Sequence, residues 1–130
     1  MEWKYDKSQV PAPIADVVVT NPRTGDQRPV PACLVDTGSP LCWLRKSDID
    51  GLGQTTNYIR SASVPGVRKM GCGMHLLALQ VWGRRFEEVW VMELPPESII
   101  GPIVGRDIIN KLELTFRGPD RGYEVADRSD

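Results

Sequence analysis

The sequence predicts an all-β fold, mainly antiparallel, with one or two short helices. Eleven prolines and twelve glycines are scattered through 130 residues and separate short apolar runs, as expected for a chain with many turns. Several of these runs are β-branched or alternate between apolar and polar residues, which is the pattern of strands. The few segments with a helical pattern are long enough for only one or two turns.

The N-terminal part is expected to be a flexible arm over residues 1–13, followed by a β-hairpin. The β-branched run Ile14–Thr20 predicts the first strand, and the chain returns along residues 30–35 after a turn rich in Pro, Gly and Asp. Pro29 and Pro31 lack a backbone N–H, so they predict an edge position or a bulge in this second strand.

The rest of the chain continues as short strands with two helical turns. Residues 41–44 predict a buried strand, and Ser47 is expected to cap a short helical turn that ends at Gly51. The later expected elements are strands at 74–82, 86–92, 99–104, 112–116 and 123–125, a short helix at 106–111 and a polar tail at 126–130. The domain is therefore expected to span residues 14–125.

Length and composition limit the classes of function. A chain of 130 residues with 41% hydrophobic residues predicts one soluble domain. A net charge of −1 does not favour nucleic acid or an anionic membrane as partner, and no long apolar run predicts membrane insertion. The three cysteines and the single histidine do not form a metal-binding pattern, so we expect no metal, no cofactor, free thiols and a cytoplasmic location. A soluble domain cut from a longer precursor is also compatible with the sequence.

Two motifs indicate where chemistry could occur. In Leu-Val-Asp-Thr-Gly-Ser-Pro, residues 34–40, an apolar strand delivers Asp36 into a tight turn, where Gly38 permits close approach of the backbone. The second motif, residues 99–109, is apolar, contains Gly101 and Gly105, and ends in Gly-Arg-Asp-Ile-Ile. Either motif alone has an ordinary structural explanation, such as a turn stabilised by its own Asp side chain.

Together and in this order, the two motifs resemble the retropepsin-like aspartic proteases, which are single-lobed and homodimeric. The resemblance extends over residues 14–125 and implies a closed-barrel-like acid protease lobe. It also implies an aspartic endopeptidase in which Asp36 and its symmetry mate activate a water molecule between them, because the chain has one Asp-Thr-Gly only. The implied partners are a second copy of the chain and a polypeptide substrate in extended conformation.

The resemblance also implies roles for individual residues. The catalytic loop would be formed by Asp36, Thr37, whose hydroxyl would bond across the dimer, and Gly38. Structural support of that loop is expected from Gly105, Arg106 and Asp107. Ser39 would hydrogen-bond the outer oxygen of the aspartate. The residues expected to bind substrate are Ser39, Leu41, Val64, Gly66, Val67 and Ile103.

Residues 58–68 are expected to form the flap, a hairpin that closes over bound peptide, with Gly66 near its tip. The chain departs from the viral members at Pro40. They have an acid at that position that pairs with the residue matching Arg106, so Arg106 needs another partner here. The C-terminal hairpin, residues 112–125, is expected to carry the dimer interface and to be poorly covered in a monomer, Tyr123 included.

Other residues have structural interpretations. Trp43, Trp82 and Trp90 lie in apolar strand patterns and are expected in the core, and His75 is expected to be exposed or hydrogen-bonded.

Two alternative functions remain open at this stage. One is a non-catalytic or weakly catalytic peptide-binding or dimerisation module of the same fold. The other is an aspartyl-phosphate enzyme that uses Asp36 as its nucleophile, although the sequence has no glycine-rich phosphate loop and no second acidic cluster for Mg²⁺.

Overall fold

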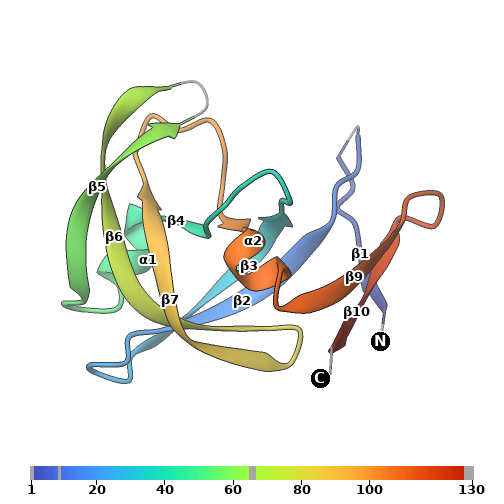
Figure 1. Cartoon of the computed structure of the whole chain (residues 1–130), viewed down its shortest axis with the longest axis horizontal. Coiled ribbons are helices and arrows are strands. Elements are labelled where there is room, and N and C mark those ends of the chain that lie inside the picture. Colours follow the sequence, from blue (N-terminus) through green and yellow to red (C-terminus); the bar gives the residue numbers. More distant parts are fainter. Residues whose placement is uncertain (1, 9, 65–66, 128–130) are drawn as a thin grey trace.

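The strands form one large sheet and one small sheet, joined by short connections (Figure 1). The computed structural model describes residues 2–8, 10–64 and 67–127. The strands are β1 Glu2–Lys4, β2 Ile14–Thr20, β3 Gln27–Val35, β4 Trp43–Arg45, β5 Thr56–Val64, β6 Val67–Val81, β7 Arg84–Leu94, β8 Ile103–Val104, β9 Leu112–Arg117 and β10 Gly122–Asp127. The helices are α1 Lys46–Asp50 and α2 Arg106–Ile109. The prediction of a mainly antiparallel all-β chain with short helices is confirmed.

The large sheet closes on itself. Its strand order is β2-β3-β8-β4-β7-β6-β5, and an additional antiparallel pairing joins β2 to β6, with Val19 opposite Leu79. The strands from β2 round to β6 therefore form a closed ring, and β5 is added outside it as a hairpin with β6. This arrangement agrees with the closed-barrel-like lobe expected from the sequence. The barrel encloses a core of buried aliphatic side chains, among them Val17, Val19, Leu77 and Val91.

The first hairpin contains the bulge that its prolines predict. The register between β2 and β3 shifts between Ala15 and Val17, so extra residues of β3 lie opposite Asp16. Ala32 adopts a positive φ of 54°, and its N–H donates to Asp16 Oδ1 at 2.9 Å. The Asp16 side chain thus replaces the ladder partner that the bulge removes.

Two expected details of the secondary structure are wrong. Helix α1 begins at Lys46, directly after β4, and its N-cap is Arg45 without a side-chain hydrogen bond; Ser47 lies inside the helix and does not cap it. The strand expected at residues 99–104 is limited to Ile103–Val104. Pro102 has no N–H to donate to a ladder, and Ile99 is exposed, so the preceding residues form an irregular loop.

The small sheet joins the two ends of the chain, in the order β1-β10-β9 (Figure 1). Within the segment expected to be an arm, residues 2–4 pair with β10, Trp3 opposite Tyr123. Tyr123 is fully buried, donates to the Ile14 carbonyl oxygen at 2.6 Å and accepts from Trp82 Nε1–H at 3.0 Å. The expectation that Tyr123 is poorly covered in one chain is therefore wrong, because the barrel itself covers it. Phe116 remains 40% exposed.

Candidate functional site

Asp36 follows the buried end of β3 directly. At that end β3 pairs in parallel with β8, Val35 opposite Val104, and the Asp36 N–H donates to the Val104 carbonyl oxygen at 3.0 Å. The carboxylate is half-buried, and its Oδ1 accepts the Gly38 N–H at 2.8 Å. The Ser39 N–H donates to the Asp36 carbonyl oxygen at 3.2 Å. The carboxylate is therefore held at the start of a tight, internally bonded turn.

The start of α2 lies directly against this turn. A Cβ atom at Gly105 would lie 2.3 Å from the Leu41 carbonyl oxygen and 2.9 Å from that of Ser39, so only glycine fits there without a backbone shift. The next N–H, that of Arg106, donates to the Ser39 carbonyl oxygen at 2.8 Å. The Gly-Arg-Asp motif is thus packed against the backbone of Ser39 and Leu41, in the loop that directly follows Asp-Thr-Gly.

Asp107 fastens the other side of the same loop. Its carboxylate accepts from Cys42 Sγ at 3.1 Å, from the Cys42 N–H at 3.4 Å and from the Ile108 N–H at 3.0 Å. Burial, and the neighbouring negative charge of Asp107, raise the pKa of the Cys42 thiol well above its ordinary value. The thiol therefore stays protonated near neutral pH and can donate to Asp107. All three cysteines are buried and free, as the sequence predicts.

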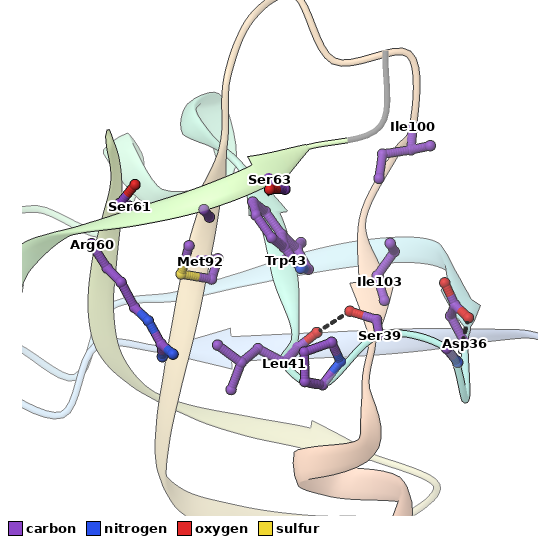
Figure 2. Close-up of a pocket in the computed structure, with 13 residues that line it drawn as sticks. Asp36, Ser39, Leu41, Trp43, Arg60, Ser61, Ser63, Met92, Ile100 and Ile103 are labelled. Carbon is purple, nitrogen blue, oxygen red and sulfur yellow. Dashed lines mark hydrogen bonds between the residues drawn. The ribbon is translucent and has the colours of Figure 1, made fainter. Parts of the chain in front are cut away.

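The remaining residues of the turn differ in their exposure to solvent. Thr37 and Gly38 are exposed. Ser39 is buried, and its hydroxyl donates to the Leu41 carbonyl oxygen at 2.7 Å. The expected hydrogen bond from Ser39 to the aspartate is therefore replaced by one within the loop, because the hydroxyl points along the loop toward Leu41 (Figure 2).

A pocket of about 330 Å³ opens beside Asp36 (Figure 2). Among the residues that the sequence predicts for the site, five line it: Asp36, Gly38, Ser39, Leu41 and Ile103. Thr37 is not part of its wall. Gly66 lies outside the described residues, and the side chains of Val64 and Val67 do not belong to the described part either. Predicted catalytic and substrate-binding residues from two separate segments, residues 36–41 and Ile103, therefore border one cavity.

Sequence reasoning assigned no catalytic or substrate-binding role to the other eight residues, which are more than half of this wall. The additional lining residues are Pro40, Trp43, Arg60, Ser61, Ala62, Ser63, Met92 and Ile100. The run of small residues at 61–63, within the segment assigned to the flap, is the signal that could have indicated a cavity there. Met92 had no such signal, because it lies in an apolar strand like many core residues.

The hairpin assigned to the flap pairs along its length. β5 and β6 are antiparallel, with Tyr58 opposite Met74 and Ala62 opposite Met70. Ala62 packs against the buried cluster that contains Trp43 and Met92, so the hairpin forms one wall of the pocket. The extension of the strand from residue 74 back to Val67 makes this hairpin longer than the sequence pattern predicts.

The residues given structural interpretations behave mostly as expected. Trp43 and Trp82 are buried, whereas Trp90 is half-buried and packs edge-on against Tyr58, with ring centroids 5.1 Å apart. Trp43 also borders the pocket. His75 is hydrogen-bonded, to Thr55 Oγ1 at 2.6 Å and to Glu93 Oε1 at 3.3 Å.

Arg106 has an exposed side chain, and no ion pair of the described residues includes it. Its contribution to the site in this chain is the backbone N–H. Over the described residues, no cluster of three His, Cys, Asp or Glu side chains is arranged to hold a metal ion. Neither helix in this part of the chain has the length and apolarity needed to cross a membrane.

Comparisons with known proteins agree with the geometry at the level of the fold. No protein-family model and no curated protein sequence matches the chain. Among solved structures, the chain is similar to that of the EIAV protease complexed with the inhibitor HBY-793, with a TM-score of 0.54 and 18% sequence identity. The similarity covers 81% of this chain and 91% of that protease. The chain therefore has a retropepsin-like fold.

Proposed function

We propose that this protein is a homodimeric aspartic endopeptidase with Asp36 as its catalytic residue. The observation that carries the proposal is the position of Asp36. Its carboxylate stands at the wall of an apolar pocket, at the end of a buried strand, in a turn clamped by Gly105 and Arg106. A rigid scaffold of this kind is what a catalytic carboxylate requires. The fold shared with a known protease supports the same function.

The chemistry requires a second carboxylate. In aspartic proteases two carboxyl groups share one proton, because like charges about 3 Å apart cannot both ionise; the ionised group acts as base on the water and the protonated one as acid. Asp36 is the acidic side chain among the described residues that line the pocket. The second group is therefore assigned to Asp36 of a second copy, related by a two-fold axis.

The surface around the turn is compatible with that dimer. Thr37 and Gly38 are exposed beside Asp36 in a single chain, so a partner can approach them. We assign to Thr37 a hydrogen bond across the dimer, and to the hairpin of β5 and β6 the closure over substrate. Extended peptide would lie between that hairpin and the turn, with Ser39, Leu41 and Ile103 around it. We keep the substrate-binding role that the sequence predicts for Val64, Gly66 and Val67 as part of this proposal.

The test is cleavage of a diverse peptide library, with product masses read directly. Asp36→Asn should lower turnover at least ~10²-fold while leaving the fold intact, because the amide cannot exchange the shared proton. Wild-type activity should follow a bell-shaped pH profile, because both limbs report the titration of the two Asp36 carboxyl groups. The maximum should lie below neutrality, because one carboxyl group must be ionised while the other stays protonated. Activity per mole should fall on dilution, because each site needs two chains.

Three results would contradict the proposal. Wild-type rates in purified Asp36→Asn would mean that another group performs the chemistry. A rate that rises steadily to pH 9 would contradict a shared proton. A wild-type protein that binds extended peptides and a transition-state mimic without cleaving any of them would show that the chain is the binding module instead.

A further inference from the structure

The candidate pocket is lined by a cationic side chain that forms no ion pair with an acid among the described residues. Arg60 lies on β5 and lines the same cavity as Asp36. Its side chain is exposed and extends from β5 past Met92 toward Leu41 (Figure 2). The ion pairs between described residues include Arg28–Asp48, Lys46–Asp50, His75–Glu93, Arg85–Glu87 and Arg117–Glu124.

None of these pairs includes Arg60. The acidic residue in the described pocket wall, Asp36, already accepts a hydrogen bond within its own turn. Asp36 Oδ1 accepts the Gly38 N–H at 2.8 Å, and the carboxylate is assigned to catalysis. A guanidinium group stays protonated at every accessible pH and carries five N–H donors. In the described part of the chain, Arg60 therefore offers its charge and its donors to the cavity.

The strand geometry directs Arg60 inward rather than away from the barrel. Residues two apart on a strand share a face, and Ala62 packs against the buried cluster of Trp43 and Met92. The residue directly opposite Arg60 on β6 is Cys72, which is buried in the same cluster. Side chains of directly paired residues lie on the same face of a sheet. Arg60 thus shares the face that borders the pocket.

The floor beneath the guanidinium is apolar. Leu41, Trp43, Met92 and Ile103 line the cavity together with Arg60. Such a site favours a side chain with a short aliphatic stem and a charged end, since the stem contacts the floor and the end reaches the guanidinium. A carboxylate suits the planar fork of arginine, which can donate two parallel hydrogen bonds to it.

We propose that Arg60 is a specificity residue that selects a Glu or Asp side chain in the bound peptide. This inference rests on the proposed function, because it assumes that extended peptide occupies the pocket beside Asp36. The acidic side chain would lie over Leu41 and Met92 with its carboxylate against Arg60. The alternative source of the same chemistry is the C-terminal carboxylate of a short peptide.

The experiment compares peptides that differ only in Glu against Gln, placed in turn at each position around a cleaved bond. Peptides capped at both ends carry no terminal charge, so the side chain is the probe; a matched set with a free C-terminus tests the other source. We expect kcat/KM to favour Glu by roughly 5- to 30-fold at one position, between the effect of an exposed ion pair and that of one charge-assisted hydrogen bond. The preference should weaken as ionic strength rises.

Two variants and one control assign the preference to Arg60. Arg60→Met keeps an apolar stem and should bring the Glu/Gln ratio of kcat/KM close to one. Arg60→Glu should lower that ratio below one, because two carboxylates repel each other. Arg23, in the exposed turn between β2 and β3, is the matched control, because Arg23→Met removes the same charge away from the pocket. It should leave the ratio unchanged. Thermal melting of each variant verifies folding.

The outcomes separate this inference from the proposed function. Cleavage without any Glu/Gln difference, or with a difference that survives Arg60→Met, overturns the role of Arg60 and leaves the protease assignment standing. If binding to Arg60 is seen only for peptides with a free C-terminus, the site recognises a terminal carboxylate. That result also overturns the selection of an acidic side chain by Arg60. If wild type cleaves nothing, fluorescence anisotropy with the same peptide pairs still decides: equal affinity for Glu and Gln peptides refutes the inference, and an Arg60-dependent difference supports it.

Discussion

Substitution of Gly105 by alanine is the most direct test of how the turn that carries Asp36 is supported. Gly105 has φ −100° and ψ −173°, which is extended backbone that alanine adopts without strain. The effect of the added methyl group is therefore purely steric. That methyl group would lie 2.3 Å from the Leu41 carbonyl oxygen and 2.5 Å from its carbon.

The magnitude follows from these contacts. Ordinary van der Waals contact begins at 3.4 Å, so the Leu41 carbonyl must retreat by about 1 Å. Both atoms in conflict are backbone atoms, and no side-chain rotation can relieve them. Overpacking of this kind costs typically 1–3 kcal/mol. The same movement stretches the hydrogen bonds from Arg106 N–H to Ser39 and from Ser39 Oγ to Leu41, at about 1 kcal/mol in total.

We therefore expect Gly105→Ala to lower the free energy of unfolding by about 2–4 kcal/mol. For a domain of this size the melting temperature should fall by roughly 7–15 °C. Below that temperature, peptide cleavage should fall as well, because Ser39 and Leu41 line the pocket and their loop carries Asp36. Calorimetry at fixed protein concentration measures the first effect, and kcat/KM on one peptide measures the second.

Gly118→Ala is the matched control for this experiment. Gly118 lies in the turn between β9 and β10, and a Cβ atom there would meet no atom within 4 Å. The same substitution should therefore leave the melting temperature within about 2 °C of wild type. If Gly105→Ala and Gly118→Ala melt alike and cleave alike, the start of α2 does not support the turn, and the packing argument is wrong.

Two further predictions concern stability. Burial raises the pKa of Cys33 to about 12 from an ordinary 9.0, so the stability that its neutral thiol contributes is present below pH 9 and is lost as pH rises from 9 to 12. Denaturation between pH 8 and 10 should therefore show a loss about 1.4 kcal/mol smaller in Cys33→Ala than in wild type, and equal losses would exclude this thiol as the cause. Tyr123→Phe leaves the buried Trp82 N–H and the Ile14 carbonyl without their partner, and urea unfolding should show a loss of about 2–3 kcal/mol. An unchanged midpoint would mean that water replaces the phenol.

The sequence alone determined those features of this protein that depend on local chemistry. Alternating and β-branched runs predicted most strands, because each strand must present one face to the core. Pro29 and Pro31 predicted the bulge, because a residue without N–H cannot complete a ladder. The Asp-Thr-Gly turn was also predictable from the sequence, because the conformation of a tight turn depends on the residues within it.

Tertiary structure decided which distant residues meet. The contact of Gly105 with the backbone of Ser39 and Leu41 arises from the parallel pairing of β3 with β8, which no local pattern encodes. Tyr123 looked exposed in its hairpin but is buried by Ile14 and the barrel. Arg60 entered the pocket wall because β5 pairs with β6 in one register; a shift by one residue would turn its side chain to the opposite face.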